Sequence, residues 1–202
     1  MKKRLCIMLL VALVLTVTPA FSKESSEHKI EQYGEWLHEP WFFVEQYNHF
    51  LEDTLRTRLP ESQETDDLIS ASLIVSDPEW SSDDPDALVR VYRGPDYTLK
   101  FECDQTPEKT TAKRFTFVGD QYGEAMDVYE FLMLKPFIEL CLYAYKIYDS
   151  DYDKLMTSVF SVNSIDDIGI NLDGSGGTYE MDGCVLRYAK EGDAMVFSFA
   201  AP

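Results

Sequence analysis

The sequence predicts an α+β protein in which antiparallel strands form one sheet, or two sheets joined edge to edge, with two long helices on one face. Two long stretches have apolar residues at steps of three and four, from Ile30 to Leu59 and from Met126 to Ile147. Short alternating apolar segments, with turn residues between them, follow each stretch. If the two halves of the chain repeat each other, neither half can bury its sheet face by itself, so the helices are expected to pack there.

A proline lies inside each helical pattern, Pro40 in the first and Pro136 in the second, which begins near Glu124. Proline lacks the backbone N–H that an interior turn needs, and its ring clashes with the preceding turn. We therefore expect each long helix to be kinked at its proline, or two helices to meet there. The aspartates of residues 149–153 are expected to end the second helix.

The remaining segments predict loops and strands. Residues 60–67 are polar and indicate a loop. We expect strands at five further segments: 69–76, 87–103 as a hairpin with its turn at 93–96, 113–119, 168–172, and 184–200 as a second hairpin.

The two halves of the chain, residues 27–120 and 121–202, resemble each other. At an offset of 96 residues the helical patterns superpose, and Pro40 meets Pro136. At an offset of 97, residues 88–97 match residues 185–194. An internal duplication would explain both offsets, whereas a chance register between two amphipathic helices would explain the first. The sequence leaves both interpretations open.

The first 22 residues have the pattern of a secretory signal peptide. A basic start precedes an apolar run of about a dozen residues, and Ala20 and Ser22 are small residues at cleavage spacing. This run is short for a bilayer span, which takes about 20 residues, and no later segment is apolar for long enough. We expect export after cleavage near Ser22, to the periplasm or the medium, and one α+β domain over residues 23–202.

The predicted mature chain is strongly acidic. It keeps 15 of the 18 Lys and Arg residues and all 36 Asp and Glu residues, a net charge of −21. Such a surface repels phosphate backbones and anionic lipid, which argues against nucleic-acid binding. It attracts cations or a basic protein partner, and it also favours solubility.

Three cysteines follow the signal peptide: Cys103, Cys141 and Cys184. This number is too small for a disulfide scaffold. Cys141 lies in an apolar helical stretch and is expected to be buried, whereas Cys103 and Cys184 both lie in predicted strands. In an oxidising compartment a Cys103–Cys184 disulfide is one alternative, and free thiols are the other.

Aromatic residues are dense at the start of the first helix: Tyr33, Trp36, Trp41, Phe42, Phe43, Tyr47 and Phe50. Trp41, Phe42 and Phe43 are consecutive, so they spread around most of the helix and cannot all face one core. Exposed aromatic residues surrounded by charge are typical of protein interfaces. We predict partner binding at Trp36, Trp41 and Phe42, with burial of the helix between two layers as the alternative.

The second candidate site is a metal loop at residues 171–182. Oxygen-bearing side chains occupy positions one, three, five and twelve of a calcium-loop pattern: Asn171, Asp173, Ser175 and Asp182. Gly176 stands at position six, as the pattern requires, but Thr178 stands where an aliphatic residue is usual. The flanking segments also resemble strands, whereas an EF-hand needs helices. A glycine-rich turn between strands is the competing interpretation.

The sequence contains no motif that indicates an enzyme. The sequence lacks a G-x-S-x-G nucleophile motif, an H-E-x-x-H metal motif and a phosphate-binding glycine loop. His38 follows Glu35 with Glu-x-x-His spacing, but a di-iron site needs a second such pair, and the second helix has no histidine. His38 and His49 are therefore expected on the polar face of the first helix. The sequence favours an exported, non-enzymatic protein that binds a macromolecule or supports the cell envelope, with calcium binding at 171–182 as the alternative.

Overall fold

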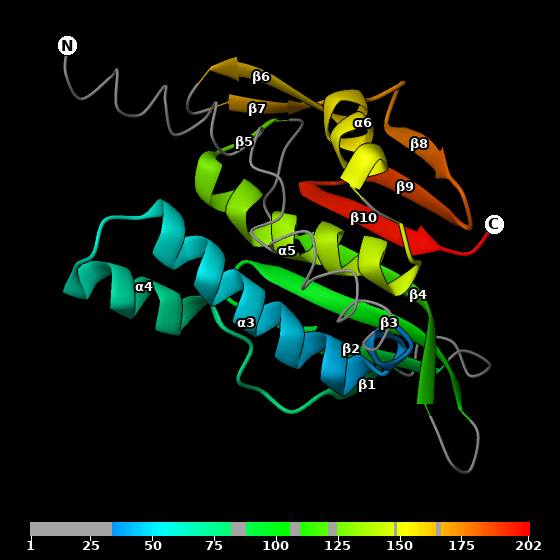
Figure 1. Ribbon diagram of the computed structural model, residues 1–202, viewed down its shortest axis with the longest axis horizontal. Helices are drawn as coiled ribbons and strands as arrows, with labels where there is room; N and C mark the ends of the chain where they lie inside the picture. The colour runs from blue at the N-terminus through cyan, green and yellow to red at the C-terminus, as the bar shows by residue number, and fades with distance from the viewer. Residues whose placement is uncertain (1–33, 82–87, 106–109, 121–124, 148, 165–166) are drawn as a thin grey trace.

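The computed structural model describes residues 34–81, 88–105, 110–120, 125–147, 149–164 and 167–202 (Figure 1). Within these residues the protein has the predicted α+β fold, with a large antiparallel sheet, a small second sheet, and helices packed on the large sheet. The predicted signal peptide, and the start of the predicted first helix at Ile30, lie outside the described residues.

The large sheet has seven strands, each antiparallel to its neighbours. Their spatial order is β1 (Glu79–Ser81), β2 (Leu88–Arg93), β3 (Tyr97–Gln105), β4 (Thr110–Gly119), β10 (Ala194–Ala200), β9 (Cys184–Glu191) and β8 (Gly176–Met181). The small sheet has the order β5 (Ala125–Met126), β7 (Asp167–Ile170) and β6 (Phe160–Ser164). Both predicted hairpins are confirmed, as β2–β3 and β9–β10.

Large apolar side chains, most of them aromatic, form rows across the core face of the large sheet. Phe101, Phe115 and Phe199 are cross-strand partners on β3, β4 and β10. The next row along the same strands has three further members: Leu99, Phe117 and Phe197. All of these side chains are fully buried. A sheet face of this kind is stable only when another layer covers it.

Two helices, α3 (Pro40–Arg58) and α5 (Val128–Ala144), lie side by side on that face (Figure 1). Tyr47 of α3 is fully buried, and its hydroxyl donates a hydrogen bond of 2.8 Å to the backbone oxygen of Met133 on α5. This bond satisfies a polar group that burial would otherwise leave without a partner. It therefore joins the two helices at the centre of the core.

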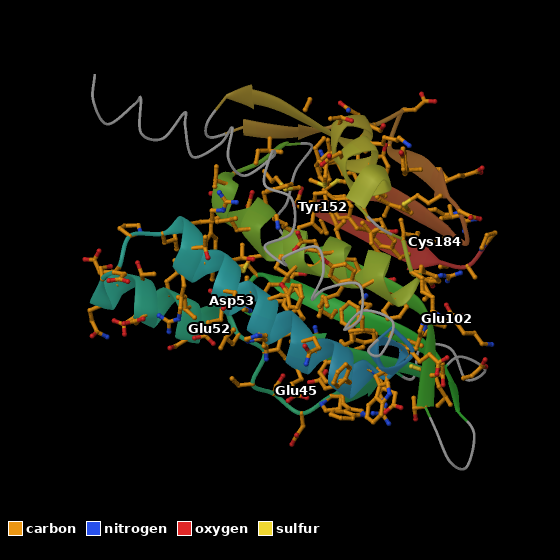
Figure 2. The ribbon with its side chains drawn as sticks, in the orientation of Figure 1. Glu45, Glu52, Asp53, Glu102, Tyr152 and Cys184 are labelled. Atoms are coloured by element: carbon orange, nitrogen blue, oxygen red, sulfur yellow. The ribbon has the colours of Figure 1, made fainter. Side chains whose placement is uncertain are left out.

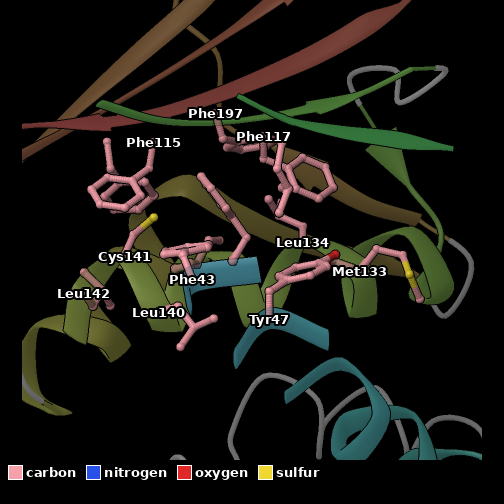
Figure 3. Packing of buried hydrophobic residues seen from close by; sticks show 14 of the residues in the cluster. Phe43, Tyr47, Phe115, Phe117, Met133, Leu134, Leu140, Cys141, Leu142 and Phe197 are labelled. Atoms are coloured by element: carbon pink, nitrogen blue, oxygen red, sulfur yellow. The ribbon is translucent and has the colours of Figure 1, made fainter. Parts of the chain in front are cut away.

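Phe43 of α3 connects both helices to the sheet. Its ring centroid lies 5.3 Å from Phe101, 5.1 Å from Phe115 and 6.0 Å from Phe137 of α5. Figure 3 shows Phe43 and Tyr47 on the helix side, with Phe115 and Phe117 on the sheet side. Aromatic side chains bury a large apolar area, so this cluster is a principal source of stability.

Helix α4 (Gln63–Ser72) occupies part of the segment predicted as a loop and the first half of the strand predicted at residues 69–76. That prediction is wrong because Ser62 is a helix N-cap, and its hydroxyl accepts the Thr65 N–H at 3.1 Å. Glu64 and Asp66 in the first turn are favourable at the positive end of the helix dipole.

The aspartates at residues 149–153 begin helix α6 (Asp149–Val159) and do not end α5, so this prediction is also wrong. Helix α5 ends earlier, at Ala144, where Lys146 adopts a positive φ of 59°. The Lys146 N–H bonds to the Tyr143 oxygen, and the Ile147 N–H bonds to the Leu142 oxygen. This pair of bonds is the Schellman arrangement that closes many helices.

The predicted kinks are not confirmed. Pro40 is the first residue of α3, where a missing N–H removes no bond, and a 3-10 turn, η1 (Trp36–His38), precedes it. Pro136 lies inside α5, which runs as one helix from Val128 to Ala144.

The predicted duplication is not confirmed either. Pro40 begins one helix, whereas Pro136 lies inside another, so the offset of 96 does not superpose the helices. The offset of 97 pairs β2–β3 with β9–β10. In the sheet, however, β4 and β10 are neighbours at the centre, and β9–β10 occupies the place that corresponds to β3–β4.

Helix α5 is surrounded by other parts of the protein. Every residue from Phe131 to Ala144 is buried, including Lys135 and Glu139. A helix that is apolar around its whole circumference is usual at the centre of a core. Among the helices that the structure describes, none has the length and apolar character that a membrane span requires.

Candidate interaction surface

The predicted partner-binding residues lie together in η1 and the first turn of α3. Trp36 and Trp41 are 53% and 50% exposed, whereas Phe42 is buried beside them. The Phe42 ring centroid lies 6.0 Å from that of Trp36 and 5.6 Å from that of Trp41, both in edge-to-face geometry. These three residues are called the aromatic cluster below.

Trp41 is exposed because the opposite side of α3 already fills the core. Phe43 and Tyr47 face the sheet and α5 and are fully buried. Successive helical residues are about 100° apart, so Trp41, two residues before Phe43, projects away from the core. Of the large apolar side chains whose exposure the structure describes, only Trp36, Trp41 and Val75 are exposed.

Carboxylates surround the aromatic cluster. The Trp41 indole Nε1 donates a hydrogen bond of 2.9 Å to Glu39 Oε2, which restricts the orientation of the indole. Glu35 precedes Trp36, and Glu45 lies one turn after Trp41; both are exposed (Figure 2 shows Glu45 on α3). Residues 34–81 carry eleven Asp and Glu residues and two Lys and Arg residues. The electrostatic potential around the cluster therefore favours a positively charged partner.

His38 links η1 to the rest of the fold. Its Nδ1 lies 3.0 Å from the backbone oxygen of Ala112 on β4, and its Nε2 lies 3.1 Å from the backbone oxygen of Ala144. Its ring contacts Phe115 and Tyr145 edge to face, at centroid distances of 5.3 and 5.6 Å. The prediction that His38 lies on a polar helix face is wrong, because both ring nitrogens bond to other elements.

The predicted calcium residues do not surround one point. Asp173 and Gly176 form an isolated antiparallel bridge, after which β8 runs as an extended strand to Met181. At about 3.3 Å per residue, Asp182 lies roughly 20 Å from Ser175. The Asn171 side chain donates a hydrogen bond to the Ser158 oxygen at 2.9 Å. In this structure the segment is a turn followed by a strand.

Two glycines of this segment have structural roles. Gly174 has φ of 69°, a left-handed conformation that suits glycine. A Cβ atom at Gly177 would lie 2.3 Å from the ring of Tyr188 on β9, so the ring packs directly on the glycine backbone. The Tyr188 hydroxyl donates to the Asn171 oxygen at 2.9 Å. The glycine-rich sequence is therefore explained by chain geometry.

No group of three or more His, Cys, Asp or Glu residues that could hold a metal ion exists within the described residues. The described residues include the segment 171–182 and the acidic surfaces of α3 and α4.

All three described cysteines are free and buried. Two strands, β4 and β10, separate Cys103 on β3 from Cys184 on β9, so the backbones are at least about 14 Å apart. A disulfide needs Cα atoms within about 7 Å, which excludes the Cys103–Cys184 alternative in this fold. Burial raises the pKa of Cys103 to about 11 and that of Cys184 to about 12, and it raises that of Cys141 well above its usual value.

Two buried charged side chains form an ion pair on α5. Lys135 Nζ lies 2.5 Å from Glu139 Oε1, and both side chains are buried. Burial raises the pKa of Tyr152, and the nearby Glu139 carboxylate adds to this effect. Among the side chains whose burial the structure describes, Glu139 is the only buried carboxylate. Those side chains therefore include no pair of buried carboxylates that could act as acid and base in hydrolysis.

Sequence reasoning did not identify His38 or the Lys135–Glu139 pair as important. The sequence does contain a pattern that indicates the pair, since Lys and Glu four residues apart inside an apolar helix must be buried together. His38 has none, because its partners are backbone oxygens of residues 74 and 106 positions away.

Comparisons of the chain with protein-family models, curated proteins and solved structures find no match.

Proposed function

We propose that this protein is exported and acts without catalysis, by binding a protein partner at the cell envelope or outside the cell through the aromatic cluster. The observation that carries the proposal is the half-exposure of Trp36 and Trp41 around buried Phe42. Tryptophan is enriched among the residues that dominate interface free energies, because it buries a large area at little cost in side-chain entropy.

The partner is a basic protein. Glu35, Glu39 and Glu45 lie within one turn of the tryptophans, and residues 34–81 carry a large excess of carboxylates. Charge of one sign around apolar anchors raises the association rate of an oppositely charged partner and disfavours acidic ones. The same charge makes nucleic acid an unfavourable ligand.

The test is capture of partners on immobilised residues 23–202. Envelope and extracellular fractions of the source organism are applied to the wild-type protein and to the double variant Trp36→Ala/Trp41→Ala. We expect a basic protein on the wild type and a loss of affinity of about 30-fold or more in the double variant, as for truncation of interface hot spots. Raising the salt from about 50 to about 500 mM should slow association, because salt screens the carboxylates.

The matched control is Val75→Ser. Val75 is 88% exposed, so this variant removes an apolar side chain that is more accessible than either tryptophan and lies outside the aromatic cluster. It lies next to Ile74, whose backbone bonds to Asn48, about 10 Å further along α3 than Trp41. Equal loss of the partner in Val75→Ser and in the tryptophan variant would contradict the proposal.

Export has its own test. We expect the mature protein from the source organism to begin near Lys23, after removal of residues 1–22. N-terminal sequencing of the protein from envelope and extracellular fractions measures this directly. An intact N-terminus on protein found inside the cell would contradict export and leave the aromatic cluster to be tested against internal partners.

Calcium binding remains the alternative function. Its test is thermal unfolding of residues 23–202 in EDTA and then in excess calcium, where a ligand at 100 times its Kd adds about 2.7 kcal/mol. A shift in Tm that Asp173→Ala abolishes would favour calcium over partner binding. The extended course of β8 argues for no shift.

A further inference from the structure

The large sheet has a second face, opposite to the core. Buried residues of α3, α5, α6 and the small sheet all belong to one core, on the face that carries the aromatic rows. Along β10, Phe197 and Phe199 are part of this core. The residues that alternate with them, Val196, Ser198 and Ala200, are only half-buried. The three cross-strand rows that pass through these three residues are called the outer face below, and most of their members are half-buried or exposed.

The centre of the outer face is flat and uncharged. On β4 and β10, Val118 lies opposite Val196, and Thr116 lies opposite Ser198. The Thr116 and Ser198 hydroxyls form a hydrogen bond of 3.2 Å with each other. On β9, Ala189 continues the valine row. Because these five side chains are small, a second sheet can approach to about 10 Å, the usual distance between packed sheets.

The outer face also differs from the rest of the protein in charge. It carries four cations, Arg93, Lys100, Arg114 and Arg187, and three carboxylates, Glu79, Glu102 and Glu180. Elsewhere the described residues carry eight Lys and Arg residues and 24 Asp and Glu residues. Two copies of the protein therefore repel each other through most of their surfaces, but not through their outer faces.

Two of the four cations have carboxylate partners on the same face. Arg93 lies 3.2 Å from Glu79, and Arg114 lies 2.7 Å from Glu102. The outer face is thus close to neutral locally as well as in sum, and it does not favour nucleic acid or another polyanion. It suits a surface that is itself close to neutral, and the outer face of a second copy is such a surface.

The outer face has the size that a stable dimer needs. Seven strands about 4.8 Å apart, with five residues along each at about 3.4 Å, cover a plane of roughly 600 Å². The accessible surface of the side chains is larger than this plane. Specific dimers bury about 600–1,000 Å² on each partner, so contact over the outer face alone falls in that range.

We propose that two copies of this protein form a dimer through their outer faces. The two seven-stranded sheets pack face to face, with the valine rows and the Thr116–Ser198 rows at the centre and charged residues at the margin, which is the usual anatomy of an interface. Such a contact is isologous and closes at two copies. The aromatic cluster lies with α3 on the other side of each sheet and stays accessible. The inference does not rest on the proposed function.

The oligomeric state tests the proposal. Sedimentation velocity of the purified protein is measured from about 1 to about 200 μM, and we expect a dimer to form within this range. Raising the salt from about 50 to about 500 mM should lower the Kd of the dimer, because salt screens the repulsion between two chains of net charge −21. The same change should weaken the binding of a basic partner. A protein that stays monomeric up to the highest concentration would contradict the dimer.

Val196→Glu places a carboxylate at the centre of the outer face. Position 196 is half-buried in the single chain, so the monomer can keep the new carboxylate hydrated, whereas the dimer would bury its charge. We expect the Kd to rise about 100-fold or more, the factor for an unpaired buried charge. Val75→Glu is the matched control, because it makes the same change at a residue that is 88% exposed outside the outer face. It should leave the Kd unchanged.

Ser198→Cys gives a second measurement, which still decides the matter if Val196→Glu fails to fold. The thiols of Cys103, Cys141 and Cys184 are buried, so a thiol at the half-buried position 198 reports on the outer face. We expect its alkylation to slow as the protein concentration rises through the Kd, because the dimer covers it. Val75→Cys should react at a constant rate. Alkylation at position 198 that does not depend on concentration would overturn the proposal, as would a dimer that Val196→Glu leaves intact.

The tryptophan variant separates this inference from the proposed function. Trp36→Ala/Trp41→Ala should dimerise like the wild type. Loss of the dimer in that variant would place the contact between copies at the aromatic cluster, and the outer-face dimer would be wrong. A variant that still dimerises and also still captures the basic partner would contradict the proposed function and leave the outer-face dimer standing.

Discussion

Helices α3 and α5 cover the same face of the large sheet, but they differ in how completely their apolar residues are buried. From Phe131 to Ala144, α5 buries every side chain. The start of α3 buries Phe43 and leaves Trp41, two residues earlier, half-exposed. Apolar content alone therefore does not mark a binding surface. The informative residues are those that remain exposed after the core is full.

The two helices also differ in their charges. The ion pair of α5, Lys135–Glu139, is buried. On α3, Arg56 pairs with Glu52 and with Asp66 of α4, and the three side chains are between 38% and 53% exposed. Exposed pairs contribute little to stability, whereas a buried charge depends strongly on its partner. An ion pair therefore matters for the stability of the fold in α5, whereas the ion pairs on α3 contribute little to stability.

The largest expected difference in stability is between two substitutions within α3. Phe43→Ala should destabilise the protein by about 3–5 kcal/mol, because it opens a cavity among fully buried rings. Trp41→Ala should change stability by about 0.5 kcal/mol or less, as for other surface substitutions. Urea unfolding of both variants measures the difference. A destabilisation of Trp41→Ala that approaches that of Phe43→Ala would remove the contrast between core and surface.

Lys135→Ala tests whether the charged side chains of α5 are shielded from solvent. It leaves the Glu139 carboxylate buried without a cation, which costs about 3–5 kcal/mol at neutral pH. The double variant Lys135→Met/Glu139→Leu removes both charges and should be much closer to the wild type. The free energies of unfolding of the two variants are compared by urea titration. A mild single variant would mean that Glu139 reaches solvent.

The rate of thiol alkylation compares Cys103 on β3 with Cys141 on α5. Because the thiolate is the nucleophile and the pKa of Cys103 is raised to about 11, about 0.1% of it is ionised at pH 8. Alkylation should accelerate about tenfold per pH unit up to the pKa, and it should be slower at Cys141, in the interior of α5, than at Cys103. Mass spectrometry of the modified peptides measures both rates. Fast reaction at Cys141 in the folded protein would show that α5 is accessible.

The smallest expected change in stability is at the end of α5, close to the hydrogen bond between His38 and the Ala144 oxygen. Lys146 has a positive φ of 59°, which glycine adopts without strain, so Lys146→Gly should stabilise the protein by about 0.5–1 kcal/mol. Lys146→Ala is the control, because it removes the same side chain and keeps the strain. Thermal unfolding compares the three proteins. Equal Tm values for the Gly and Ala variants would mean that this turn carries no backbone strain.

Local features of the chain were predictable from sequence because they depend on neighbouring residues. The helical spacing that begins α3, the hairpin turn at 93–96 and the final hairpin at 184–200 were all found. The sequence also indicated that Trp41, Phe42 and Phe43 cannot share one helix face, but it did not tell which of them is exposed: Trp41 is, whereas Phe42 and Phe43 are buried. Helix α4 was missed although its N-cap, Ser62, stands in the sequence, because the apolar residues after it also fit a strand.

By itself, the sequence determined the α+β class, the two hairpins, the acidic charge and the surplus of aromatic residues at the start of α3. The tertiary structure decided that β4 lies beside β10, that β8 carries Asp182 away from Asp173, and that His38 meets two backbone carbonyls. The physical reason is the separation in sequence between the residues that interact. Periodicity and turn chemistry act within a few residues, whereas strand order and hydrogen bonds to backbone oxygens join residues far apart, and backbone oxygens look the same in every residue.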